Sequence, residues 1–286
     1  MKFFKKTLAA LATVGALTGA GSANAYLTDW YFDANGSVNG TADAVLVPDN
    51  LSMDSSAVGY ISVFATSATD FMFQETGVIR FAGANSGQAF TQTLFATYTL
   101  NGTGKFGSGT STFDGDANFT GGTFSLWVGA NTYAGTTDTY GVGPTNQTLI
   151  ATFDVFGDKI TGLNNIGQPV SGNATNNTQF QIVGSANWLA SDYFYLPDGV
   201  TDIAGLTDAL TWGFVVGNAT SIAPSGNMVS EFGPQDLVLD PSNDDYTVSF
   251  FVNHGGQARL QVPEPATLAL SGLALLGLGA LRRRQA

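Results

Sequence analysis

The feature that most constrains the fold is a series of short segments in which apolar side chains recur at every second residue. In residues 123–128, Phe124, Leu126 and Val128 fall on one face of an extended chain, and residues 246–252 repeat this pattern. A spacing of two residues is typical of a β-strand, whereas a helix would repeat about every 3.6 residues. Segments rich in aromatic and β-branched side chains predict further strands at residues 57–66, 78–81, 90–100, 149–156, 179–183 and 211–216.

The segments between these strands are rich in Gly, Asn, Asp and Ser, which suit tight turns. Examples are NGTGKFGSG at residues 101–109 and FDGDANFTGG at residues 113–122. No long amphipathic helix is evident, although a short helical turn is expected around residues 186–190. The sequence therefore predicts an all-β protein with a single β-sandwich or jelly-roll-like domain over residues 26–261, between two terminal segments of different character.

The composition leaves little room for catalysis. The 286 residues include no Cys and one His, so a disulfide framework, a thiolate metal site and a cysteine nucleophile are excluded. A histidine-dependent triad would depend on His254 alone, and that residue follows a predicted strand in NHGGQ, where a solvated turn is expected. The only glutamates of the central region are Glu75 and Glu231. We therefore expect a protein that is not an enzyme and needs no cofactor.

The central region is strongly acidic, because residues 26–261 hold 21 acidic and 4 basic side chains, a net charge of −17. Nucleic-acid binding requires the opposite sign, so a nucleic-acid partner is excluded. Carboxylates suit calcium, and two acidic groups are candidate ligands: Asp114 with Asp116, and Asp240 with Asp244 and Asp245. Neither group has the spacing of an EF-hand loop, which favours ordinary acidic turns.

The first 25 residues are typical of a secretory signal peptide. The chain begins with the basic stretch MKFFKK, continues with an apolar stretch, and then places small side chains at Ala23 and Ala25. This order predicts export through the Sec machinery and cleavage by signal peptidase after Ala25, which leaves Tyr26 as the first residue.

The last 25 residues, 262–286, have three parts. Pro263, Glu264 and Pro265 form a rigid, extended segment, because each proline restricts itself and the residue before it. Residues 266–281 are apolar but short for a bilayer core, which needs about 20 residues. Arg282, Arg283 and Arg284 follow and would stay on the cytoplasmic side, with the central region outside. A plain C-terminal anchor would also fit this pattern.

The order and spacing of these three parts resemble the PEP-CTERM sorting signal of Gram-negative bacteria. The resemblance implies a short hydrophobic sorting helix, transient association with the inner membrane through residues 266–281, and cleavage by an exosortase. The protein would then be released or transferred to the cell surface or extracellular matrix. The stretches GTFSLWVGANTYA, IATFDVFGDKITG and SANWLASDYFYLPDGVTDI resemble flocculation-associated PEP-CTERM proteins. That second resemblance implies a role in exopolysaccharide-associated floc or biofilm formation.

Aromatic side chains are candidates for contact with exopolysaccharide, because an aromatic face stacks on the C–H groups of a sugar. Trp127 and Trp212 lie within apolar strands and are expected in the core, which leaves Trp188, Tyr193 and Tyr195 as the candidates.

Three functions remain open at this point. The leading one is a non-catalytic surface or matrix protein. The alternative is a secreted carbohydrate-binding or carbohydrate-active module, and the third is a self-assembling fibre built from exposed apolar strands.

Overall fold

The computed structural model describes residues 24–27, 29–37, 44–53, 57–67, 69–84, 87–106, 113–129, 147–156, 159–161, 178–205, 211–222, 232 and 247–263. The chain divides into two compact units, one spanning Leu27–Leu260 and the other combining Met1–Tyr26 with Gln261–Ala286. Each unit is described by itself. The apolar part of the predicted signal peptide and the predicted sorting helix at 266–281 lie outside the described residues.

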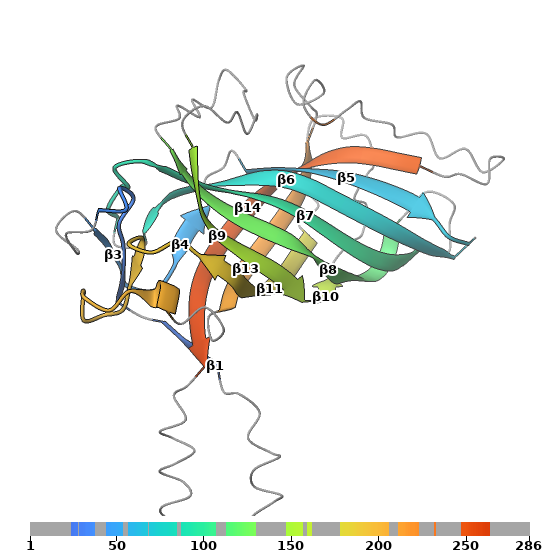
Figure 1. Cartoon of the computed structure of the whole chain (residues 1–286). Helices are drawn as coiled ribbons and strands as arrows, with labels where there is room; N and C mark the ends of the chain where they lie inside the picture. The colour runs from blue at the N-terminus through green and yellow to red at the C-terminus, as the bar shows by residue number, and fades with distance from the viewer. Residues whose placement is uncertain are drawn as a thin grey trace, which may run out of the picture. The chain divides into compact units, whose positions relative to one another are not determined.

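The larger unit is built from antiparallel strands (Figure 1). Its short strands are β2 (Trp30–Phe32), β3 (Val45–Val47), β4 (Leu51–Met53), β10 (Lys159–Thr161) and β12 (Phe194–Tyr195). Its long strands are β5 (Ala57–Ala65), β6 (Asp70–Ala84), β7 (Thr93–Phe106), β8 (Phe113–Gly129), β9 (Gln147–Phe156), β11 (Thr178–Leu189), β13 (Thr211–Ile222) and β14 (Thr247–Pro263), of which residues 247–260 belong to this unit. No helix among the described residues has the length and apolar character needed to cross a membrane.

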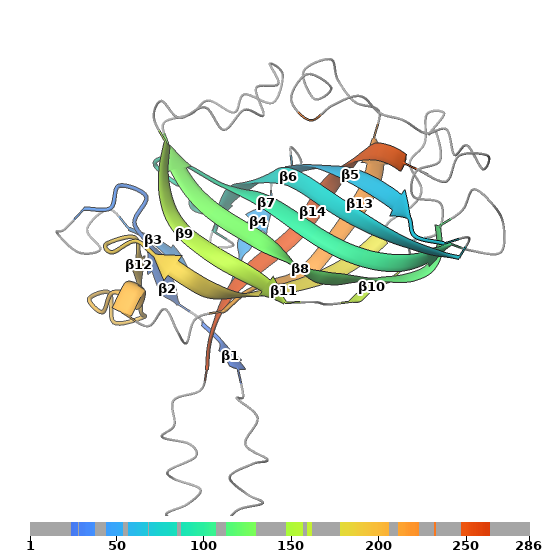
Figure 2. The same ribbon diagram turned by 45° about the vertical axis from the view of Figure 1, so that its right-hand side comes forward.

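The large sheet curls until its pairings return to their starting strand. From β14 the pairings pass through β13, β11, β10 or β9, β8, β7 and β6, and β5 and β4 each pair with both β6 and β14. Figures 1 and 2 show the result as two curved layers, with β6, β7 and β8 in front of β13 and β14. The predicted all-β, sandwich-like architecture is confirmed.

The core fills the space between the layers and follows the predicted alternation. Along β6, Phe71 and Phe73 are buried while the intervening Met72 is exposed. In β8, Phe124, Leu126 and Val128 are all buried, as their spacing predicts. Each large apolar side chain removed from water in this way contributes roughly 1.5–3 kcal/mol to folding.

A second, three-stranded sheet, in the order β12–β2–β3, has its own aromatic cluster. The ring of Phe32 lies 5.6 Å from that of Phe194 and 5.1 Å from that of Phe90, and Trp30 lies 6.1 Å from Phe194. The sequence patterns did not predict these short strands, because two or three residues are too few to display a period.

In two glycine-rich segments predicted as turns, the residues that the structure describes belong to strands instead. Residues 101–106 are the end of β7, and residues 113–122 are the beginning of β8. In β7 the glycines provide space: a Cβ on Gly102 would collide with the ring of Phe73, and one on Gly104 with the ring of Phe71. Gly102 and Gly104 pair directly with these two phenylalanines across β6 and β7, so the rings fill the room that the missing side chains leave.

The helical turn expected around residues 186–190 is also absent. Residues 186–189 belong to β11, which carries a bulge between Ala186 and Trp188. The pairing of these residues with β9 outweighs the local preference for a helix, because the sheet satisfies backbone hydrogen-bonding groups that a helix would otherwise pair.

Candidate functional site

In the smaller unit, which combines residues 1–26 with residues 261–286, the described residues bring the two predicted processing regions together. Strand β1 (Asn24–Tyr26) pairs antiparallel with the end of β14, so that Asn24 lies opposite Pro263 and Tyr26 lies opposite Gln261. Ala25, after which signal peptidase is expected to cut, lies opposite Val262. Both segments are extended, the backbone form in which peptides add to a sheet edge or a binding groove.

Most of the other predicted sorting residues lie outside the described residues. These are Ala23, Glu264, Pro265, Arg282, Arg283 and Arg284. Strand β14 ends at Pro263, so the described chain stops at the first residue of the Pro-Glu-Pro segment.

The three aromatic candidates for polysaccharide contact differ in exposure. Trp188 is 44% exposed at the bulge of β11, where it pairs with Thr152 of β9. Tyr193 is partly buried and its ring packs against Gly36. Tyr195 is buried in β12, which does not suit contact with a polymer. Among the three, Trp188 has the geometry of a surface platform.

The pKa of Tyr193 is raised, first by burial and then by the negative charge of Asp33, while a hydrogen bond with Thr148 opposes these effects. Its hydroxyl therefore stays protonated to a higher pH than that of an exposed tyrosine, and it lies against Gly36 in the turn that follows Asp33. This environment gives Tyr193 a structural role beside any contact with a ligand.

The two tryptophans expected in the core are placed differently. Trp127 points to the outer side of β8, half-buried, and its Nε1 donates a hydrogen bond of 3.0 Å to Oγ1 of Thr97. Its ring stacks on that of Phe95, with centroids 6.5 Å apart. Trp212 lies in β13, but its side chain is outside the described part of the structure.

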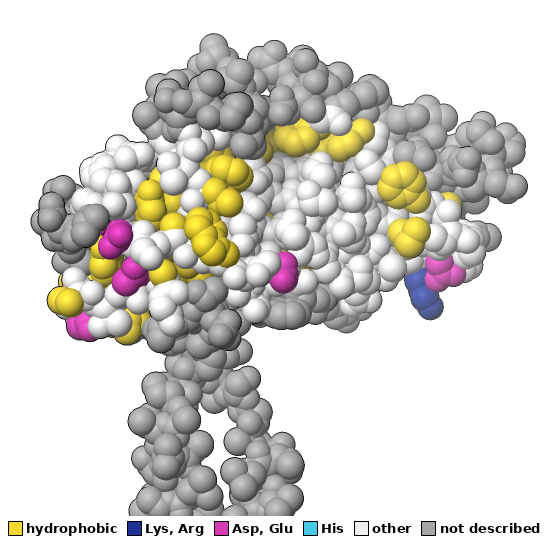
Figure 3. All heavy atoms as spheres, in the orientation of Figure 1, with side chains coloured by type: hydrophobic (Ala, Val, Ile, Leu, Met, Phe, Trp, Pro, Cys, Tyr) yellow, Lys and Arg dark blue, Asp and Glu magenta, His cyan; other side chains and the backbone are white. Residues whose placement is uncertain are grey.

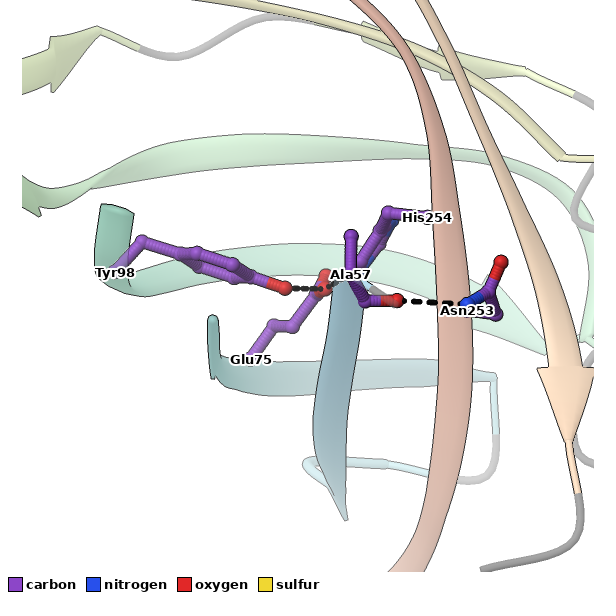
Figure 4. Close-up of polar contacts among 5 residues, drawn as sticks. All are labelled: Ala57, Glu75, Tyr98, Asn253 and His254. Carbon is purple, nitrogen blue, oxygen red and sulfur yellow. Dashed lines mark hydrogen bonds and ion pairs between the residues drawn. The ribbon is translucent and has the colours of Figure 1, made fainter. Parts of the chain in front are cut away.

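A buried polar triad, which we define as Glu75, Tyr98 and His254, lies in the interior of the larger unit (Figure 4). The hydroxyl of Tyr98 donates to Oε1 of Glu75 over 2.8 Å, and Nε2 of His254 lies 2.5 Å from the same oxygen. The side chains come from β6, β7 and β14, and each residue is at most 6% exposed. Burial, followed by the charge of Glu75 and the hydrogen bond to it, raises the pKa of Tyr98 well above its usual value.

Neighbouring glycines make room for the triad. A Cβ on Gly59 would collide with the ends of all three side chains, and a Cβ on Gly77 would collide with the Tyr98 ring and the backbone of Val58. The triad is thus packed closely and closed to solvent. A buried carboxylate requires such partners, because an unpaired charge in the interior is very costly.

The prediction of a solvated turn for His254 is wrong: the residue is 4% exposed and lies inside β14. The sequence did contain a signal for a buried partner. Glu75 continues the alternation of Phe71 and Phe73, so its side chain is expected to point inward. An acid at an inward position needs a donor, and the chain has a single histidine to offer.

Metal binding receives no support from the described residues, among which no group of three His, Asp or Glu side chains could hold an ion. Asp114 and Asp116 lie within β8 rather than in a turn. Asp240, Asp244 and Asp245 lie outside the described residues.

The PEP-CTERM protein-sorting motif family matches residues 261–284. The chain carries a PEP-CTERM sorting signal. No curated protein and no solved structure matches the chain. The PEP-CTERM match includes Pro263, Glu264 and Pro265, the apolar run and Arg282–Arg284.

The PEP-CTERM signal makes this an exported protein that an exosortase processes and that is directed through the membrane toward the cell surface. The pairing of β1 with the end of β14 adds a structural detail. In a chain cut after Ala25, the new N-terminus at Tyr26 would lie beside Gln261, the first residue of the matched PEP-CTERM region.

Proposed function

We propose that the protein is a cell-surface or matrix component that acts without catalysis by holding exopolysaccharide and cells together in flocs or biofilm. The PEP-CTERM signal is the observation that carries the proposal, because it accounts for export and delivery to the surface. The partners are signal peptidase and the Sec machinery during export, exosortase during sorting, and exopolysaccharide afterwards.

Two features of the larger unit support a binding role over hydrolysis. Retaining and inverting glycosidases both need a pair of carboxyl groups that reach the scissile bond. Glu75 is shielded from substrate by burial and is engaged by Tyr98 and His254. By contrast, Trp188 is exposed and could contact a polymer.

A strain in which the gene is deleted tests this role. We expect reduced floc mass and reduced retention of polysaccharide on cells, both restored by the wild-type gene. Unchanged flocs combined with loss of growth on a polysaccharide would instead support a secreted carbohydrate-active enzyme.

A sorting variant in the same strain tests delivery. Replacing Pro263, Glu264 and Pro265 by Ala should leave membrane insertion intact, because the apolar run and the arginines are unchanged. The tail should remain uncut, and restoration of flocs should fail. Normal processing of this variant would make the Pro-Glu-Pro segment a spacer and the tail a plain anchor.

A further inference from the structure

The outer side of the front layer carries two transverse rows of hydroxyl side chains. The first row crosses five strands in register, through Thr76, Thr99, Thr123, Asp154 and Ser185. The second row lies beside it and passes through Thr97, Ser125 and Thr152 to Trp188. We call these two rows the hydroxyl face.

The hydroxyl face is accessible. Thr123 and Asp154 are exposed, and the remaining serines and threonines of the two rows are partly exposed. Figure 3 views this layer from outside, and most of the surface over β6, β7 and β8 is white, the colour of uncharged polar side chains and backbone, with few charged side chains. Since neighbouring strands lie about 4.8 Å apart, a row of five strands spans roughly 19 Å, long enough for several sugar rings in line.

The chemistry of the hydroxyl face fits sugars. Each Ser or Thr hydroxyl both donates and accepts hydrogen bonds, as does each hydroxyl of a sugar. Threonine is stiff at χ1, so little conformational freedom is lost when a ligand binds. At one end of the second row, the indole of Trp188 offers an apolar surface for the C–H groups of a sugar ring.

The charge of the hydroxyl face favours a neutral polymer over an anionic one. The two rows contain one charged side chain, Asp154, which can accept hydrogen bonds from sugar hydroxyls but repels carboxylate or sulfate groups. The chain as a whole is also acidic, with a net charge of −12. An anionic polysaccharide would therefore be disfavoured on this face, and a neutral one would not.

We propose that the hydroxyl face binds an extended chain of a neutral polysaccharide across the strands, with Trp188 stacking on a sugar ring at one end. The inference rests on the proposed matrix function, to which it adds the site and the class of ligand.

Affinity electrophoresis of the full chain in mild detergent tests the site. The gels contain hydroxyethyl cellulose, dextran or galactomannan as neutral polymers, or alginate as an anionic one. The wild-type protein should be retarded by at least one neutral polymer and not by alginate.

Two variants should weaken that retardation about tenfold, the scale expected when one of the main contacts is removed. One is Trp188→Ala. The other is the double variant Thr99→Val with Thr123→Val, which removes two hydroxyls but keeps the β-branched shape. Phe64→Ala is the matched control, because Phe64 is 43% exposed on β5 but lies outside both rows. Equal melting temperatures would show that the variants are folded.

The proposal is overturned if no neutral polymer retards the wild type, if alginate binds more strongly, or if the row variants migrate like Phe64→Ala. It is also overturned if the row variants change only self-association in sedimentation, since the face would then bind a second copy. The deletion strain separates the two proposals. Failure of the wild-type gene to restore flocs rejects the matrix function, whereas loss of polymer binding in the row variants still supports the face.

Discussion

The two sides of β6 and β7 differ most clearly in the surroundings of their polar side chains. On the inner side, Glu75 and Tyr98 are buried, and both belong to one hydrogen-bonded triad. On the outer side, Gln74 and Asn101 are exposed and bond to each other over 3.1 Å. Polar side chains on the two sides thus have opposite consequences: an inward polar group must be satisfied by the protein, while an outward one can be satisfied by water or by a ligand.

The largest effect should follow from removing the acceptor of the triad. Glu75→Ala leaves the buried Tyr98 hydroxyl without its acceptor and takes the carboxylate away from His254, which should cost about 2–4 kcal/mol in free energy of unfolding. Urea denaturation measures the change. Gln74→Ala, one residue away on the outer side, is the control and should change stability by less than about 0.5 kcal/mol. Similar losses for both variants would remove the distinction between the two sides.

A smaller loss is expected from overpacking the inner side. Gly102→Ala directs a methyl group into the Phe73 ring, which should cost about 1–3 kcal/mol. Adding Phe73→Leu should recover part of this loss, and a double-mutant cycle would measure the coupling between the two positions. Thr103→Ala, at the exposed neighbouring position, serves as the control. Strictly additive losses would show that the glycine does not make room for the ring.

Alkaline pH should act through the triad as well. Below pH of about 10, Tyr98 is protonated in both the folded and the unfolded states and has no effect on the pH dependence. Above it, the unfolded state loses the proton while the raised pKa keeps it in the folded state, so the free energy of unfolding falls as pH rises.

Melting temperatures between pH 9 and 11 measure this slope. Tyr98→Phe should be less stable at neutral pH, because it lacks the hydrogen bond to Glu75, but should lose stability less steeply with pH. Some slope should remain, since the pKa values of Tyr193 and Tyr195 are raised too, in both cases chiefly by burial. An identical slope in the variant would assign the alkaline transition to other groups.

The sequence predicts the parts of this contrast that are local. Alternation placed Phe124, Leu126 and Val128 inward because each strand repeats its own pattern. The alternation could not show that Gly102 and Gly104 continue a strand, because these glycines make room for aromatic rings that belong to another strand, β6. The triad was missed for the same reason: His254 and Glu75 are 179 residues apart, and only the closure of the sheet brings them together. The hydroxyl face likewise depends on the register of five strands.

The smallest effect on stability should come from removing the Trp188 ring, for which Trp127, also on the outer side, provides a matched comparison. Trp127→Ala loses the stacking on Phe95 and the hydrogen bond to Thr97, and should cost about 2–3 kcal/mol. Trp188→Ala removes a ring that is 44% exposed, so the loss should stay near 0.5–1 kcal/mol. Thermal unfolding of the two variants gives the ranking. A Trp188 loss equal to that of Trp127 would place its ring in a packing role, because a side chain that stabilises the fold strongly is held by the protein and has less surface left for a sugar. A small loss together with weakened polymer binding would show that an outward aromatic side chain serves the ligand rather than the core.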